Sequence, residues 1–300
     1  MEWVKHMNDA LSYMEDNLDG EISIEKAARL ARCSPHHLRR MFSYITGTPL
    51  SEHLRRRRIT KAAFDLRNGD KVLDVALRYG YESPTAFNRA FQAIHGISPS
   101  AAQKSDAALK TFPPVSLQIT VKGVTQMDYR IVEKEGFRVV GIRIKIEGGS
   151  EEEDGIIASF LPEEEDKIID SFWDEACKKG QPERIKGLIN GKPAGLIGLF
   201  VDADSRDSGY YYYVCGVTDK PAPEGMHEAN IPKHTWAVFA GADEPSTKAD
   251  LFHRICSEWL PNAGYEFAAG IDMEVYFDSD PNDSRYEIWI PVVKKRTAGG

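Results

Sequence analysis

Two segments of the chain carry side chains that can hydrogen-bond to nucleic-acid bases, and they recur 49 residues apart. Each segment opens with Ser-Pro, at Ser34 and again at Ser83, and continues with basic, amide or hydroxyl residues. Arginine can donate two hydrogen bonds to guanine, asparagine can pair with adenine, and threonine can contact the methyl group of thymine. The predicted base-contacting residues are His36, Arg39, Arg40, Thr85, Asn88 and Arg89.

These segments belong to a longer repeat, which predicts the elements that position the side chains. Serine followed by proline is a strong signal for the start of a helix, with Ser as the N-cap and Pro as the first helical residue. Seven residues keep their type at equivalent places in both copies. Ala27, Ser34, Pro35, Arg40, Phe42, Ile45 and Gly47 correspond to Ala76, Ser83, Pro84, Arg89, Phe91, Ile94 and Gly96. The repeat indicates two equivalent structural units.

Each unit is predicted to be a helix-turn-helix, in which the second helix lies in the major groove of DNA. Helix pairs also occur in all-α proteins that bind no DNA. Hydrogen-bonding residues at the presented positions of both units favour DNA binding. A helix over residues 50–66 should connect the units. It carries four successive arginines, Arg55–Arg58, of which at most two can face DNA because the run points around most of the helix.

The charge is distributed unevenly along the chain. Residues 1–110 hold 17 Lys and Arg against 13 Asp and Glu, whereas the remaining residues hold 21 against 33, and the net charge is −8. A basic front suits a polyanion, and an acidic back favours cationic partners. The four cysteines are scattered, without metal-ligand spacing, so we expect reduced thiols and neither a metal nor another cofactor.

Length and hydropathy indicate a cytoplasmic protein of two domains. The 300 residues fit about two domains, no apolar run approaches the roughly 18 residues of a membrane helix, and no signal peptide opens the chain, so no membrane partner is expected. The helical pattern breaks near Pro113-Pro114. We therefore predict an all-α DNA-binding domain over residues 1–105, a linker over 106–126 and a second domain over 127–300.

The second domain is predicted to be α+β and to contain the pattern β-α-β-β twice. The first copy has strands at 137–146, 195–201 and 210–217 and a helix at 162–179. The second copy has strands at 235–240, 273–277 and 286–293 and a helix at 248–260. This duplication suggests two modules packed about a pseudo-twofold axis, with a cleft between them.

The last strand combines an acid with an aromatic side chain. Because side chains alternate between the two faces of a strand, Glu287 and Trp289 share one face, and the apolar residues between and after them should meet the helices from the other face. An acid beside aromatic rings suits a lipophilic cation, through charge pairing and cation–π attraction. The alternative interpretation is a surface glutamate beside ordinary cross-strand packing.

A run of four tyrosines lies on an earlier strand. Tyr211 and Tyr213 would share one face of it, and a register slip of one residue would replace them with Tyr210 and Tyr212.

Residues 7–103 closely resemble the AraC/XylS class of transcription regulators. The matching segments are SIEKAARLARCSPHHLRRMF, RRRITKAAFDL and VLDVALRYGYESPTAFNRAFQAIHGISP. The resemblance implies that the two recognition helices enter successive major-groove segments on one face of the DNA. It also implies base-edge roles for the six residues named above, while the operator sequence stays open.

Residues 127–295 resemble GyrI-like effector-binding domains, through IPKHTWAVFAG, WLPNAGYEF, MEVYFD and YEIWIPVVK. The resemblance implies a ligand in the central groove between two modules, with an acid at the position of Glu287 contacting cationic ligands. The expected wall residues of this effector site are Trp289, Trp173, Tyr211, Tyr213, Trp259 and Tyr276.

The leading hypothesis is a transcription regulator, not an enzyme, whose partners are double-stranded DNA, a hydrophobic cationic effector and RNA polymerase. Two alternatives stay open for the second domain. It could hydrolyse a small molecule, with Glu287 as a general base if burial raised its pKa, or it could be a protein-interaction module whose aromatic residues are only core. Two units in one chain already contact two groove segments, so dimerisation is not required.

Overall fold

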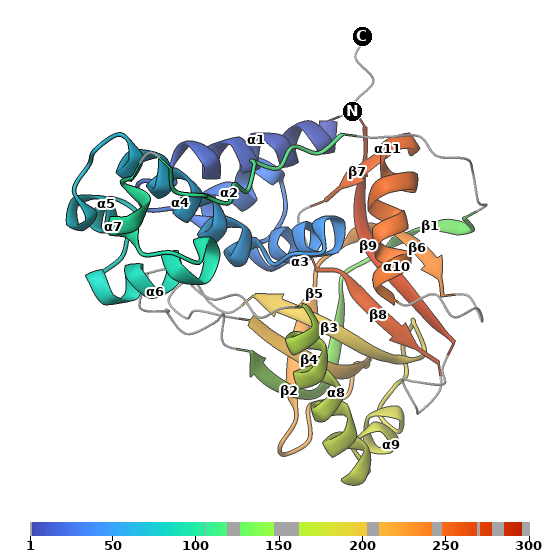
Figure 1. The fold of residues 1–300 in the computed structure, drawn as a ribbon. Coiled ribbons are helices and arrows are strands. Elements are labelled where there is room, and N and C mark those ends of the chain that lie inside the picture. Colours follow the sequence, from blue (N-terminus) through green and yellow to red (C-terminus); the bar gives the residue numbers. More distant parts are fainter. Residues whose placement is uncertain are drawn as a thin grey trace.

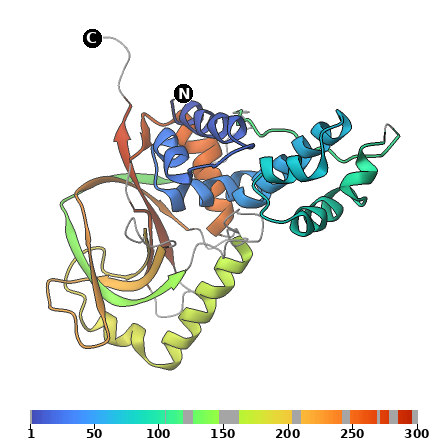
Figure 2. The same ribbon diagram turned by 90° about the vertical axis from the view of Figure 1, so that its left-hand side faces the viewer.

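The computed structural model describes residues 2–104, 106–118, 127–146, 162–202, 210–241, 248–268, 271–277 and 285–295. A helical lobe leads into a lobe built on one curved sheet (Figures 1 and 2). The predicted fold class, an all-α domain followed by an α+β domain, is confirmed. Within the described ranges, no helix is long and apolar enough to cross a membrane.

The helical lobe contains the two predicted helix-turn-helix units. Its helices are α1 (Glu2–Asp16), α2 (Ile24–Ala31), α3 (Pro35–Thr46), α4 (Leu50–Arg67), α5 (Val72–Arg78), α6 (Pro84–His95) and α7 (Pro99–Ala102). The side chains of Ser34 and Ser83 cap α3 and α6 by accepting hydrogen bonds from the backbone N–H groups of His37 and Ala86. Both helices end at a glycine in the left-handed region, with φ of 67° at Gly47 and 76° at Gly96. Glycine adopts this conformation without steric cost, so the repeated Ser-Pro and Gly set the length of both helices.

The connecting helix α4 holds its arginines mainly by internal pairing. Arg57 is buried and donates to both carboxylate oxygens of Glu15, and buried Arg58 donates to the carbonyl oxygen of Gly20. Arg55 and Arg56 both pair with Glu52. Arg57 and Arg58 are therefore turned inward, and the expectation that at most two of the four face DNA stays a prediction.

The second lobe contains a nine-stranded antiparallel sheet in the described part of the chain. Its strands are β1 (Tyr129–Lys134), β2 (Phe137–Ile146), β3 (Leu196–Asp202), β4 (Tyr210–Val217), β5 (His227–Ile231), β6 (His234–Ala240), β7 (Tyr265–Phe267), β8 (Met273–Tyr276) and β9 (Tyr286–Lys294). Its helices are α8 (Pro162–Lys178), α9 (Gln181–Lys186), α10 (Lys248–Arg254), the π-helical turn η1 (Ile255–Trp259) and α11 (Leu260–Asn262).

The strand order shows the predicted pseudo-twofold arrangement. The order is β1-β6-β9-β8-β3-β4-β2-β5, with β7 added to β9. One module is β2-α8-β3-β4 and the other is β6-α10-β8-β9, so the predicted β-α-β-β duplication is confirmed. The modules meet where β3 pairs with β8. The outer strand β1 pairs with β6 of the second module, and the outer strand β5 pairs with β2 of the first.

The two faces of the sheet carry different apolar sets. On one face, Ile288 and Ile290 pack with α10 and η1, and Tyr212 and Tyr276 pack with Trp173 of α8. We call this the helix-covered face. The opposite face carries a separate cluster that includes Tyr213, Val275, Trp236 and Trp289. The alternation predicted for the last strand is confirmed, because its apolar residues meet the helices.

The first helix-turn-helix unit and the second module share one hydrophobic core. Leu38 and Phe42 of α3 belong to the same buried cluster as Phe252, Ile255 and other residues of the second module. The second unit has a core of its own, built around Phe87 and Phe91. In Figure 2 the second unit extends away from the sheet, whereas the first lies against it. Leu117, in the predicted linker, lies on the helical lobe, where its backbone exchanges two hydrogen bonds with the Asn8 side chain.

Candidate functional site

The first recognition helix faces the second lobe. Helix α3 contacts α8, α10 and η1, so it touches the helices of both modules. His36 is only 4% exposed, and its ring stacks on Phe200 of β3 with a centroid distance of 4.4 Å. The ring of Tyr210 lies equally close on β4. A residue predicted to meet a base edge is thus buried among aromatic side chains of the other domain.

Arg40 is the centre of the contact between the lobes, and its side chain is only 10% exposed. Its Nη1 donates to Asp272 Oδ2 at 2.9 Å, and its Nη2 donates to Glu274 Oε1 at 2.7 Å. The guanidinium carbon also lies 4.8 Å from the centroid of the Phe200 ring and 5.4 Å from that of Phe252. Two carboxylates and two aromatic rings of the second domain therefore surround one cation of the first.

The charges in this cluster stabilise one another. Burial raises the pKa of Asp272, but a hydrogen bond to His37 and the charge of Arg40 bring it well below its usual range. Burial likewise raises the pKa of Glu274, and the charges of Lys248 and Arg40 outweigh that effect and lower it. Burial lowers the pKa of Arg40, but the neighbouring acids and Tyr44 raise it well above its ordinary value. Both acids are therefore ionised at neutral pH.

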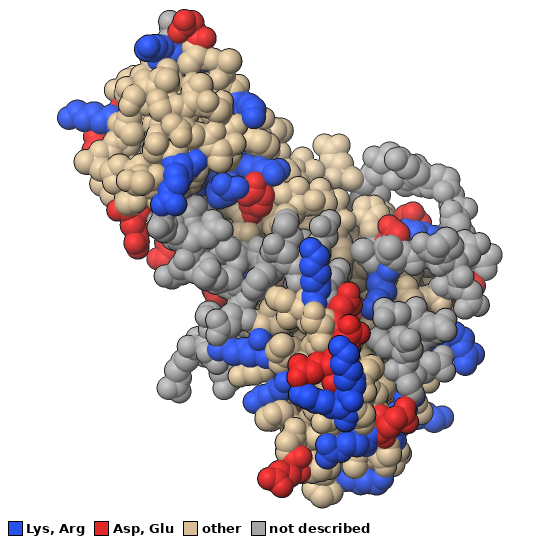
Figure 3. All heavy atoms as spheres, turned by 60° about the horizontal axis from the view of Figure 1, so that its bottom comes forward, with Lys and Arg blue, Asp and Glu red and all other residues tan. Residues whose placement is uncertain are grey.

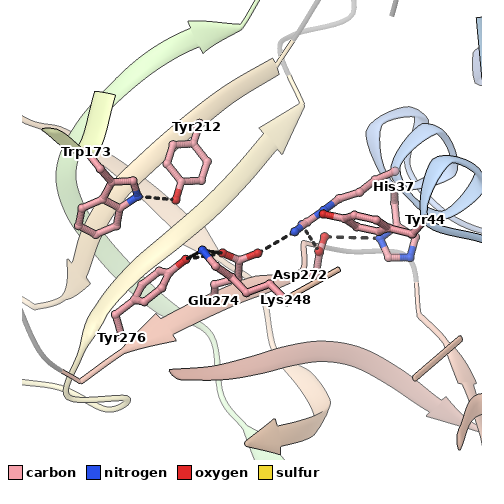
Figure 4. Close-up of polar contacts among 9 residues, drawn as sticks. His37, Tyr44, Trp173, Tyr212, Lys248, Asp272, Glu274 and Tyr276 are labelled. Carbon is pink, nitrogen blue, oxygen red and sulfur yellow. Dashed lines mark hydrogen bonds and ion pairs between the residues drawn. The ribbon is translucent and has the colours of Figure 1, made fainter. Parts of the chain in front are cut away.

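Glu274 lies where the two modules meet. Its strand partners are Gly198 of β3 and Ile288 of β9. Tyr276 Oη donates to Glu274 Oε2 at 2.5 Å, and Lys248 Nζ lies 3.8 Å from the same oxygen. Figure 4 shows Glu274 between Asp272 on the side of α3 and Tyr276 on the side of the sheet.

Aromatic side chains surround Glu274 on the helix-covered face. The Trp173 ring meets Tyr276 edge-on at a centroid distance of 5.4 Å, and its Nε1 donates to Tyr212 Oη at 3.0 Å (Figure 4). Burial raises the pKa of both tyrosines, so their hydroxyls stay protonated donors. Gly198 makes this packing possible, because a Cβ atom there would lie 2.5 Å from Tyr212 Oη. We call Glu274, Tyr276, Tyr212 and Trp173 the acidic–aromatic site.

The second recognition helix is presented differently. Thr85 and Arg89 of α6 are exposed and Asn88 is half-buried. Arg39, the remaining predicted base-contacting residue of α3, is also half-buried. The second unit therefore offers its predicted residues to solvent, whereas the first offers Arg39 but not His36 or the guanidinium of Arg40.

The residues predicted to bind the effector are divided between the two faces of the sheet. Glu287, Trp289, Tyr211 and Tyr213 lie on the face opposite the helices. Trp173 and Tyr276 lie on the helix-covered face, and Trp259 packs there in a different cluster, next to Phe239. One small ligand cannot contact all seven residues, because the sheet itself separates them.

Basic side chains already occupy the positions beside the predicted acid. Arg130 Nη2 donates to Glu287 Oε2 at 2.8 Å and lies over the Trp289 ring. Arg143 donates to Tyr213 Oη at 2.9 Å and lies 4.2 Å from the centroid of Tyr211. The acid and aromatic groups on this face are therefore satisfied by cations of the same domain.

Asp272 and Glu274 were not among the residues predicted from the sequence, and Tyr212 was predicted only for the alternative register of the tyrosine run. A signal was present for two of them: Glu274 and Tyr276 alternate in MEVYFD as Glu287 and Trp289 do in YEIWIP, and Tyr212 belongs to the other register of the tyrosine run. Asp272 lies just before β8 and carried no such pattern.

Comparison with known proteins identifies both lobes. A family model described as a GyrI-like small molecule binding domain matches residues 127–293, and one described as a helix-turn-helix domain matches residues 27–105. The chain is 34% identical over 302 residues to the transcriptional regulator Rob of Salmonella typhimurium, covering 95% of this chain and 97% of Rob. The chain belongs to the AraC-type regulators with a GyrI-like domain.

Two further matches each cover one lobe. The HTH-type transcriptional activator AarP of Providencia stuartii is 39% identical over 101 residues, which is 33% of this chain and 75% of AarP. The solved structure of SAV2435 bound to tetraphenylphosphonium is 20% identical, with a TM-score of 0.43, and covers 56% of this chain and 94% of that one. The family resemblance predicted from the sequence is confirmed by Rob and by the two family models.

This AraC-type regulator is thus a DNA-binding transcription regulator with a small-molecule binding domain. On the face shown in Figure 3, basic and acidic side chains are interspersed on the described surface.

Proposed function

We propose that this regulator binds operator DNA through α3 and α6, and that its GyrI-like domain binds a lipophilic cation at the acidic–aromatic site. The observation that carries the choice of a cation is the state of Glu274. This carboxylate is buried, ionised and flanked by aromatic rings, and it already accepts a hydrogen bond from a guanidinium of another domain. A buried anion requires a cationic partner, and aromatic rings add cation–π attraction.

The acidic–aromatic site fits the proposed effector better than the opposite face does. The cation hydrogen-bonded to Glu274, Arg40, comes from outside the second domain, and Lys248 of the same domain lies 3.8 Å away, whereas the cation on Glu287 is Arg130 on the adjacent part of the same sheet. An effector could replace a group on another domain when the domains move apart. An effector that displaced Arg130 from Glu287 would leave the guanidinium of Arg130 on the same surface without its carboxylate partner.

A binding measurement distinguishes these two faces. Tetraphenylphosphonium, a permanent lipophilic cation, is titrated into wild type, Glu274→Gln and Glu287→Gln, which are matched isosteric changes. We expect Glu274→Gln to weaken binding at least tenfold and Glu287→Gln to change it less than threefold. The reverse order would move the effector site to the face originally predicted from sequence, and no binding by wild type would contradict cation sensing.

The DNA part of the proposal rests on the exposed residues of α6. Thr85 and Arg89 can reach base edges, since they lie on the first turns of a helix whose N-terminus is capped by Ser83. Selection of a binding sequence from random duplexes, followed by titration of Arg89→Ala, tests this role. Sequence-independent binding in wild type would contradict it.

We infer that the effector is sensed and not consumed. A general base works best with a pKa near neutrality. Lys248 and Arg40 instead lower the pKa of Glu274 below its usual value. Incubation with a hydrolysable aromatic cation, benzoylcholine, should return the ester intact; benzoate release that depends on Glu274 would contradict sensing.

RNA polymerase is the further partner that we propose. It is supported by the description of AarP as a transcriptional activator, since an activator must raise polymerase occupancy or opening at a promoter. Transcription in vitro from the selected site should rise on addition of the regulator. Unchanged or lower transcript levels would contradict activation.

A further inference from the structure

The acidic–aromatic site and DNA require the same face of α3. His36 and Arg40 are four residues apart, so they lie on one side of the helix. His36 stacks on Phe200, and Arg40 pairs with Asp272 and Glu274. The major groove, about 12 Å wide, admits a single helix. Helix α3 cannot enter it while this side contacts α8, α10 and η1.

We propose that the Arg40 guanidinium is an internal ligand of the cation site, which withholds the first recognition helix from DNA until a cationic effector replaces it. The inference rests on the proposed function and adds its regulation. The inference also restricts the chemical class of the effector to compounds with a flat or delocalised cationic group and an apolar surface. Such a compound would match the two carboxylates and the rings of Phe200 and Phe252 that hold the guanidinium.

The two acids imitate the groups that Arg40 would meet on DNA. A guanine offers two acceptors to an arginine fork, and the phosphate backbone offers anionic oxygens. Asp272 and Glu274 offer two anionic oxygens, one to each terminal nitrogen, at 2.9 and 2.7 Å. His37 adds a contact to Asp272 at 3.4 Å. The second domain therefore offers Arg40 the same kind of acceptors, paired and anionic, that DNA would offer it.

The repeat supplies an internal comparison. Arg89 occupies the position in α6 that Arg40 occupies in α3, and it is exposed. We call the contact of α3 with the second domain the docked state, and the loss of that contact the released state. Docking covers the first unit and leaves α6 of the second unit accessible. In the docked state only α6 can enter a major groove, and in the released state both helices can.

The coupling follows from competition for one state. The effector needs Glu274 without Arg40, and full DNA contact needs Arg40 without Glu274, so both ligands bind the released state. A ligand that prefers one of two states shifts the population toward it. The effector should consequently tighten DNA binding.

The decisive experiment compares DNA affinity of the full chain with and without the two acids. The test protein is Asp272→Asn with Glu274→Gln. The control is Glu228→Gln with Glu287→Gln, which removes the same charge from the same domain away from α3. At fixed salt and without effector, we expect the test protein to bind the selected duplex at least tenfold more tightly than wild type, and the control within threefold of it.

Single variants and hydrogen exchange guard against misfolding of the double variant. Asp272→Asn and Glu274→Gln alone each keep one acceptor and should give intermediate affinities. Amides of α3 should exchange faster in the test protein than in wild type, while those of α6 stay unchanged. Equal DNA affinities, or unchanged exchange in α3, would overturn the inference alone. Failure of every protein to bind DNA would overturn both the inference and the proposed function.

Discussion

At the scale of the residue, identical side chains can take different roles because their surroundings differ. Arg40 and Arg89 are equivalent in the repeat, yet Arg40 is enclosed by acids and rings of another domain and Arg89 is exposed. Both were predicted from the sequence as base-contacting residues, because they occupy equivalent positions of the helical repeat. It could not predict the pairing of Arg40, since Asp272 and Glu274 lie more than 230 residues away in the chain.

The two arginines should therefore differ on substitution. Arg89→Ala should weaken specific DNA binding by about 1–3 kcal/mol, the usual value of a lost base contact. Arg40→Ala should weaken it by less, because wild type must first break the bonds from Arg40 to Asp272 and Glu274. Titration of both variants against the same duplex checks this, with Lys104→Ala as a surface control. A larger loss for Arg40→Ala would mean that docking has no influence on affinity.

At the scale of the element, the sequence predicted what local patterns determine. Ser-Pro starts and Gly stops located α3 and α6, and alternation separated the two faces of β9. Alternation could not show that the acid on the helix-covered face is the buried one, because Glu274 and Glu287 occupy similar acid-aromatic patterns. The register of the tyrosine run was also ambiguous, and packing of Tyr212 on Trp173 depends on the tertiary fold.

Helix α4 contains a histidine that should make stability depend on pH. Burial, together with the charge of Arg57, lowers the pKa of His53 to about 4. In the unfolded chain its pKa is near 6.5, so the unfolded state takes up the proton first as the pH falls below 6.5. Stability from neutral His53 is therefore full above pH 6.5 and is lost progressively down to about pH 4.

Denaturant unfolding at pH 7.5 and pH 5 checks this, in wild type and in His53→Gln. The variant cannot gain a proton, so it should lose less stability than wild type, by about 1–2 kcal/mol at pH 5. Subtracting the loss in free energy of unfolding of the variant from that of wild type removes the contribution of the carboxylates that both proteins share. Equal losses would show that His53 titrates alike in the folded and unfolded states.

At the scale of the whole molecule, the two helix-turn-helix units are held unequally. The first shares a hydrophobic core with the second module, and the second has its own core. The shared core restrains the first unit, and the buried ion pairs of Arg40 with Asp272 and Glu274 lie in the same contact. Release of α3 therefore requires that two packed surfaces separate. Such a rearrangement has two discrete states, with α3 either in contact with the second domain or released from it.

The measurement that tests the central claim most directly is the DNA affinity of wild type with and without saturating tetraphenylphosphonium, at one salt concentration. Because the cation and DNA both require release of α3, the cation should tighten DNA binding about tenfold. The same addition should have little effect on Asp272→Asn with Glu274→Gln, because this variant lacks the acids that bind the cation and hold α3. A cation that binds wild type and leaves its DNA affinity unchanged, or weakens it, would contradict the account.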